Sequence, residues 1–394
     1  RSTLSSSSAA SDVYKRQLQP TDMSAGVTLR NRLGEWVDRH SGTFFIAPCA
    51  TLILFFAIFP TVYSIFFAVS RVRFTGDGLK FRYVGLRNFK KLFFGSGEVQ
   101  FLGRTDPVSI FGYVVFIIIL IAVLVWLWRS RKITTWVGMI GRTISAAMAI
   151  FLSWLLCASL LSGNAIGTLY TTLFYVIVGC ALQFVIGTGL AFLCSQPISG
   201  KNFFRVVFFI PLMITPLGVG YAMRMLADVT KGPFEPLLGL LGLSDWVWSA
   251  DAWSARFIMM IGESWQWIPF IFICMLAALE NVPNDHVEAA QVDGASSPQI
   301  FREIIWPQVL PVAATVLLIR MIEAFKIVDL PNIMTGGGPG TATESMTLQS
   351  MFVWRANDMG SSAAIAYMLL ILTVVVCASF FNYVVLGQVK KANA

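Results

Sequence analysis

Long apolar segments separated by short polar ones make up most of this 394-residue chain. A helix needs about 20 mainly apolar residues to cross the roughly 30 Å of hydrocarbon in a bilayer. Lipid offers backbone groups no partner, and no segment alternates as a barrel strand does, so the spans are predicted to be helices. The pattern predicts an all-α polytopic membrane protein with about eight transmembrane helices. These lie at about 44–70, 109–128, 143–162, 166–194, 203–227, 255–279, 307–327 and 361–387.

Composition agrees with this prediction and excludes an ordinary soluble domain. The chain is 56% hydrophobic and 13% charged, with a mean hydropathy of +0.71, whereas soluble domains are about 25% charged. Its net charge of +8 could indicate nucleic-acid binding. On a membrane protein, however, a basic excess more often reflects Lys and Arg retained at the cytoplasmic face. We therefore expect no nucleic-acid partner.

The cysteines and histidines indicate neither a metal site nor a catalytic centre. The two histidines, His40 and His286, are far apart, and no CxxC spacing occurs. All six cysteines lie in or at the ends of apolar runs, where small buried hydrophobic residues are the simplest interpretation. They are Cys49, Cys157, Cys180, Cys194, Cys274 and Cys377.

Basic residues beside the apolar segments set the orientation, because Lys and Arg stay on the cytoplasmic side. With an even number of spans they place both termini in the cytoplasm. The segment 71–108 disagrees, since it is strongly basic but falls outside. Either it packs on the outer membrane surface through its aromatic residues, or the second or third span is miscounted. The orienting residues are Arg30, Arg32, Arg39, Arg129, Arg131, Lys132, Arg142, Lys201, Arg205, Lys390 and Lys391.

The Ser-rich opening RSTLSSSSAASDVYKRQ resembles neither a signal peptide nor the rest of the chain. We expect residues 1–22 to be a reading-frame artefact or a disordered segment, with Met23 as the true start. Residues 23–43 are then a cytoplasmic N-terminus, and residues 388–394 a cytoplasmic tail. No cleavable apolar core precedes the first span, so we expect that span to remain as an anchor.

A polar hairpin, EAAQVDGASSPQIFREIIWP, separates the sixth and seventh predicted spans. Pro283 ends any upstream helix, Asn284 and Asp285 can cap a new one, and Gly294 permits a sharp turn. Ser296, Ser297 and Pro298 then start a second helix, QIFREII, that runs to Pro307. These residues alone leave two interpretations open: an ordinary solvated loop, or a compact knob that docks into a partner protein.

The spacing in this hairpin resembles the EAA motif of the permease subunits of bacterial ATP-binding cassette (ABC) importers. That motif has EAA, three residues, Gly, nine residues, Ile, one residue and Leu-Pro, and here Glu288, Gly294 and Pro307 stand in register. Trp306 replaces the usual Leu, which we expect to alter packing at the membrane entry. The segments VGLRNFKKLF, GKNFFRVVFFIPLMITPLGVGYAMRML, SWQWIPF and AFKIVDLPNIMTGGGPGTAT narrow the resemblance to the carbohydrate, maltose-permease-like branch.

The resemblance implies a six-helix type I importer core at 163–387, with a cytoplasmic coupling loop at 280–306. Residues 44–162 then hold the first span and a two-span insertion, an extra hairpin that the family does not explain. The implied partners are a second homologous permease, an ATPase homodimer and a periplasmic or lipid-anchored substrate-binding protein in a bacterial cytoplasmic (inner) membrane. The implied coupling residues are Glu288, Ala289, Ala290, Asp293, Gly294 and Pro307.

This chain is not expected to be an enzyme. Its glycine-rich segment GGGPGTATES lacks the G-K-[ST] of a phosphate-binding loop, and an outer turn is the better interpretation. ATP and Mg²⁺ are therefore expected on the partner ATPase, with no cofactor bound here.

Polar residues inside the sixth and seventh spans are candidates for the substrate path, because ionisable groups are costly in lipid. The resemblance implies sugar contacts on both of these spans, and alignment on Trp265 and Pro269 places the four sixth-span candidates at corresponding positions. Helical rise puts Glu263 about 12 Å from the outer end of its helix and Glu323 about 24 Å from the inner end of its own, so the two groups can face each other. For the seventh-span residues, the alternative to a substrate contact is an internal ion pair of Lys326 with Glu323 or Asp329. The candidates are Glu263, Gln266, Trp267, Phe270, Glu323, Lys326 and Asp329.

A secondary transporter or channel is the alternative function, favoured by the intramembrane charges. The EAA hairpin and the lack of an inverted repeat oppose it. The predicted cargo is a sugar or polyol, and glycerol phosphate importers share the same motifs.

Overall fold

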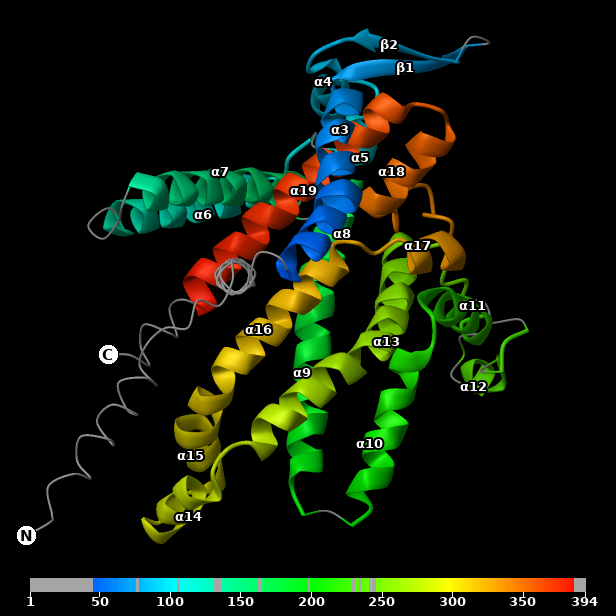
Figure 1. Cartoon of the computed structure of the whole chain (residues 1–394). Helices are drawn as coiled ribbons and strands as arrows, with labels where there is room; N and C mark the ends of the chain where they lie inside the picture. Colours follow the sequence, from blue (N-terminus) through cyan, green and yellow to red (C-terminus); the bar gives the residue numbers. More distant parts are fainter. Residues whose placement is uncertain are drawn as a thin grey trace, which may run out of the picture. The chain divides into compact units, whose positions relative to one another are not determined.

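The computed structural model describes residues 45–75, 78–104, 107–130, 136–159, 161, 165–197, 199–228, 231–233, 235–240, 242 and 246–385 (Figure 1). Two compact units divide the chain, residues 1–64 and residues 65–394. The first unit is helical from Phe45 onward, includes a π-helical turn, η1 (Leu54–Ile58), and ends within α3 (Phe59–Ala68). The expectations for residues 1–22, 23–43 and 388–394 lie outside the described residues.

Seven helical segments in the described part of the chain are long and apolar enough to cross a membrane. They match seven of the eight predicted spans to within three residues at each end, with two exceptions. The span predicted at 307–327 begins ten residues earlier, and the span predicted at 361–387 ends seven residues earlier. The segments are Phe45–Ala68, Ile110–Trp128, Gly141–Ser159, Thr168–Ser195, Ala252–Glu280, Ser297–Ala324 and Met359–Phe380.

The predicted span 203–227 is a broken helix. α10 (Lys201–Phe209) and the 3₁₀ turn η4 (Ile210–Met213) are bent by 100° from α11 (Pro216–Leu226). Pro216 explains the break, because the residue before a proline is excluded from the helical region. Thr215 is extended and its side chain caps the amide of Gly218, which starts a new helix. Counting the pair as one span gives eight.

One of three buried hydrophobic clusters in the described part of the second unit lies where α9 (Cys180–Ser195) crosses α13 (Ala252–Glu280) and α16 (Trp306–Ala324). Ile271, Phe272 and Met275 are fully buried there. A Cβ at Gly187 would lie 3.0 Å from the side chain of Ile271, so the missing side chain lets α9 and α13 approach closely. α8 (Thr168–Phe174) and a π-helical turn, η3 (Tyr175–Gly179), precede α9 in the same span.

The predicted extra hairpin is present as α6 (Ile110–Ser130) and α7 (Trp136–Ser159), which lie side by side in Figure 1. Trp154 joins them, with its ring 5.1 Å from Phe116 and 6.0 Å from Tyr113. The pair reaches the core through packing of α7 on α19 (Met359–Phe380).

The basic segment after the first span is largely regular structure. β1 (Ser70–Thr75) and β2 (Gly78–Tyr83) form an antiparallel hairpin, and α4 (Arg87–Phe94) and α5 (Glu98–Phe101) follow it. The remaining short helices are α12 (Glu235–Leu240), α17 (Asp329–Met334) and α18 (Met346–Arg355), and the π-helical turn η6 (Phe381–Val385) follows α19. The glycines of TGGGPG lie in turns, as predicted.

Candidate functional site

The polar hairpin folds as two helices. α14 (Asn284–Val292) follows Pro283, and α15 (Ser297–Ile300) continues through a π-helical turn, η5 (Phe301–Ile305), into α16. The expected capping by Asn284 or Asp285 is wrong, because Pro283 is the N-cap and makes no side-chain cap. The predicted start of the second helix is confirmed. Ser296 and Gln299 form a capping box there, and the Ser296 amide donates to Gln299 Oε1 at 2.8 Å.

Gly294 makes the turn that was predicted for it. Its φ of +80° is left-handed, and the amides of Gly294 and Ala295 donate to the carbonyls of Gln291 and Ala290 at 3.1 and 3.0 Å. This pair of bonds is a Schellman motif, which ends helices where the next residue is left-handed. α14 therefore stops abruptly and the chain turns back toward α15.

The hairpin presents most of the predicted coupling residues to its surroundings. Glu288, Ala289, Asp293, Gly294 and Pro307 are exposed, and Pro307 lies in the first turn of α16. Ala290 is buried within the hairpin, so the structure does not place it on the exposed face.

Val292, which the sequence analysis passed over, is 87% exposed and lies one turn beyond Glu288. Its place four residues after Glu288 in a short helix was the signal that could have found it, because positions i and i+4 share a helix face.

Trp306 packs at the entry to α16. Its ring centroid lies 6.0 Å from Phe301 and 6.4 Å from Phe184 on α9. The residue thus joins the end of the hairpin to the neighbouring span, which accounts for a large ring at this position.

A buried polar cluster joins three spans near the sixth-span candidates. Arg320 on α16 is 1% exposed, and its Nη2 donates to Glu263 Oε1 on α13 at 2.5 Å. Its Nε donates to Gln183 Oε1 on α9 at 2.7 Å. Arg320 was not among the predicted site residues, although an arginine inside the apolar segment VLLIRMI is itself a signal.

The other sixth-span candidates surround this arginine or neighbour it along α13. The Arg320 guanidinium lies 4.5 Å from the Trp267 ring centroid, and Trp267 contacts Phe270 edge-on at 6.2 Å. Gln266 Nε2 donates to the Ile214 carbonyl at 3.0 Å, inside the helix break. Among the buried polar atoms that have no hydrogen-bond partner in the described residues are Gln183 Nε2, Gln266 Oε1 and Arg320 Nη1.

The seventh-span candidates make no hydrogen bond or ion pair with this cluster among the described residues. Lys326 Nζ pairs with Glu323 Oε1 at 2.7 Å, and both side chains are partly exposed. The ion pair foreseen as the alternative is therefore present. Asp329 opens α17 and is exposed. The contact between the two spans comes through Arg320 and Glu263, not through Glu323.

No group of three or more His, Cys, Asp or Glu side chains in the described ranges could hold a metal ion.

A family model described as "Binding-protein-dependent transport system inner membrane component" matches residues 183–391. The match includes the hairpin, the buried cluster and more than half of the chain. The chain belongs to this family. It is thus a transport permease subunit, embedded in an inner membrane, and the predicted resemblance is confirmed.

Curated relatives support the permease assignment. The "Trehalose/maltose transport system permease protein MalF" of Thermococcus litoralis is 30% identical over 223 residues, which cover 56% of this chain and 74% of the relative. The "sn-glycerol-3-phosphate transport system permease protein UgpA" of Yersinia pestis is 26% identical over 224 residues, which cover 56% of this chain and 75% of the relative.

The fold of the permease is shared with a solved structure. A bacterial ABC transporter "involved in the import of the acidic polysaccharide alginate" superposes with a TM-score of 0.62 at 15% identity, covering 89% of this chain and 98% of that one. This likeness reaches well beyond the family match, into the segments before residue 183.

Proposed function

We propose that this permease forms the translocation path of an ATP-driven, binding-protein-dependent importer of a sugar or polyol. Its hairpin receives the movement of a separate ATPase homodimer, which carries the ATP and Mg²⁺. A second homologous permease completes the path, and a periplasmic or lipid-anchored binding protein delivers the substrate. Both termini and the hairpin then face the cytoplasm.

The exposed face of α14 is the observation that carries the coupling role. Glu288, Ala289 and Val292 stand at helical positions i, i+1 and i+4, so one face offers an acid, a small residue and an apolar anchor. This is the arrangement by which a short helix seats in a groove of a partner. The Schellman turn at Gly294 fixes how this face is held against α15.

A continuous helical path supports transmission of that movement. Residues Ser297–Ala324 form one helical segment, which carries Arg320 at its far part. Packed helices shift as rigid bodies rather than bend continuously, so a displacement of the hairpin tilts α16 as a unit. The Arg320 pairs would carry the tilt to α9 and α13.

The buried cluster supports passage of a polyhydroxylated solute along these spans. The unmatched donors of Gln183 and Arg320 and the unmatched acceptor of Gln266 are groups that hydroxyls satisfy. Trp267 adds an aromatic face. Relatives named for trehalose/maltose and for sn-glycerol-3-phosphate favour a sugar or a polyol derivative as the cargo.

The charge reversal Glu288→Lys tests the coupling. We expect ATP-driven uptake by the complete system in proteoliposomes to fall to background, because the acid on the proposed docking face of α14 is replaced by a base, while membrane insertion stays normal. Glu235→Lys, an exposed acid on α12, is the matched control and should retain uptake. Normal ATP-coupled uptake in the Glu288→Lys variant would refute the coupling role, and proton-driven uptake by this chain alone would favour a secondary transporter.

A further inference from the structure

A polar hollow of about 330 Å³ lies where β1, α4 and the start of α19 meet. Figure 1 places this region at the end of the second unit opposite α14 and α15. Neither the coupling role nor the substrate path uses it. Its lining residues are Arg71, Val84, Arg87, Asn88, Lys91, Ser96, Asp358 and Ser361.

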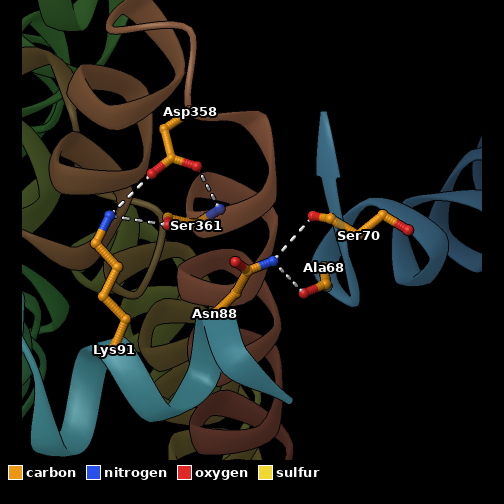
Figure 2. Close-up of polar contacts among 6 residues, drawn as sticks. All are labelled: Ala68, Ser70, Asn88, Lys91, Asp358 and Ser361. Atoms are coloured by element: carbon orange, nitrogen blue, oxygen red, sulfur yellow. Dashed lines mark hydrogen bonds and ion pairs between the residues drawn. The ribbon is translucent and has the colours of Figure 1, made fainter. Parts of the chain in front are cut away.

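The frame of the hollow is fixed by hydrogen bonds from α4 (Figure 2). Asn88 Nδ2 donates to the carbonyls of Ala68 and Ser70 at 2.8 and 3.0 Å. Lys91 Nζ pairs with Asp358 Oδ2 at 2.9 Å, one turn further along α4. The helix thus fastens the end of α3 and the start of β1 to the beginning of α19.

The charge of the hollow is not balanced. Asp358 is its single carboxylate, and Lys91 and the Ser361 amide already occupy both of its oxygens. Burial raises the pKa of Asp358, but these hydrogen bonds lower it by more, so the group stays ionised beside Lys91. No carboxylate of the described residues lies within 4.0 Å of a nitrogen of Arg71 or Arg87.

The strand register adds a second, independent observation. Arg71 on β1 stands directly opposite Arg82 on β2. Like charges in directly opposed cross-strand positions destabilise a hairpin. An anion held beside Arg71 would offset this repulsion, which the fold alone leaves in place.

The position along the chain indicates what kind of anion this is. The hollow lies between Ala68, where the first span ends, and Met359, where the last span begins. The ends of spans lie at the level of the lipid headgroups. Tyr83, Leu86 and Phe94, near the hollow in sequence, are 73%, 64% and 85% exposed, and such side chains favour the membrane interface.

We propose that this hollow binds the phosphate of an anionic phospholipid, with Arg71 and Arg87 as its donors. Guanidinium groups bind phosphate oxygens through paired N–H donors, which suits two arginines without acid partners. Lys91 holds the frame through Asp358, and the exposed apolar side chains lie toward the acyl chains.

The test uses the full chain in nanodiscs that contain phosphatidylglycerol and phosphatidylcholine. Native mass spectrometry measures how much of each lipid the protein retains on release. We expect wild type to prefer phosphatidylglycerol, and Arg71→Ala/Arg87→Ala to lose that preference by on the order of tenfold, because each basic group near an anionic surface strengthens binding. The matched control is Arg104→Ala/Arg355→Ala, which removes two exposed arginines outside the hollow and should change nothing.

Three results would overturn the proposal. The first is equal retention of phosphatidylglycerol by wild type and the Arg71/Arg87 variant at unchanged thermal stability. The second is binding of inorganic phosphate to the hollow without any lipid preference, which would assign a free anion. The third is unchanged lipid retention with lost capture of the binding protein, which would assign a protein contact.

Discussion

At the scale of single residues, two glycines decide whether separate segments of the second unit can meet. A Cβ on Gly360 would lie 2.4 Å from the Ser70 carbonyl oxygen, and one on Gly167 would lie 2.4 Å from the Gly103 amide nitrogen. Both obstacles are backbone atoms, which cannot turn aside as a side chain would. The missing side chains therefore permit the contact of β1 with α19 and the contact of α5 with the start of α8.

Gly360→Ala is expected to destabilise the protein by about 1–3 kcal/mol, the usual cost of overpacking. The methyl group would push β1 from α19 and loosen the Asn88 bonds. Thermal unfolding in detergent measures the change. Gly141→Ala is the control, because nothing lies within 4 Å of its Cβ and alanine favours the helix. Equal melting of the two variants would contradict the close approach at Gly360.

Glu344 gives the second residue-scale prediction. Burial raises the pKa of its carboxyl, although Gln100 Nε2 donates to both of its oxygens at 3.1 and 3.0 Å. A raised native pKa means that the group's contribution to stability is present at low pH and is lost as pH rises through that pKa.

Glu344→Gln should therefore melt at a higher temperature than wild type at pH 7.5, and the difference should shrink toward pH 4. Melting curves across this range measure it, with Glu235→Gln as the exposed control. A difference that grows as pH falls would show that the ionised form is the stabilised one.

At the scale of elements, the Arg320 cluster joins α9, α13 and α16 through charges buried in the bundle. Breaking a buried ion pair from one side leaves a bare charge and costs about 3–5 kcal/mol. Removing both charges avoids that penalty, so the two effects must be strongly non-additive.

We expect Arg320→Met and Glu263→Gln each to lower the thermal midpoint strongly, and the double variant to recover much of the loss. Thermal unfolding of the four proteins completes the cycle. Additive losses would mean that the two side chains act independently. Uptake by the double variant then separates two roles of the pair. If the pair is only structural, transport returns together with stability, whereas if it contacts substrate, transport stays lost although stability is recovered.

Hydrophobicity predicted the long helices well, because lipid leaves little choice of structure to an apolar segment of that length. It could not predict the break within 203–227, since the apolar composition continues through Pro211 and Pro216. The two prolines were the signal, because each disfavours helical geometry in the residue before it. The β1–β2 hairpin was missed for a similar reason: its basic and apolar residues alternate, as in SRVRFT, but its charge directed attention to topology.

The candidate site could be predicted only in part. Motif spacing located the hairpin and its bend at Gly294, and the cost of polar groups in lipid located Glu263 and Gln266. Partner choice could not be predicted, because it depends on which faces of α13 and α16 meet. The residue that pairs with Glu263 is therefore Arg320, whereas the sequence had predicted that Glu323 would face it.

At the scale of the whole molecule, the family match and the fold similarity have different extents. The family model starts at residue 183, inside α9, whereas the solved alginate transporter resembles 89% of the chain. Most of the segments before residue 183 therefore share the fold of that transporter, although the family model does not include them.

The break between η4 and α11 has a consequence for how the main chain of this span is satisfied. Main chain that leaves helical geometry at membrane depth is tolerated only against protein or a water-filled space. One freed carbonyl, that of Ile214, accepts a hydrogen bond from Gln266 Nε2. The Oε1 atom of the same side chain is buried and has no partner among the described residues. The interrupted span therefore depends on α13 for part of its hydrogen bonding, and a substitution at Gln266 would leave the Ile214 carbonyl without this donor.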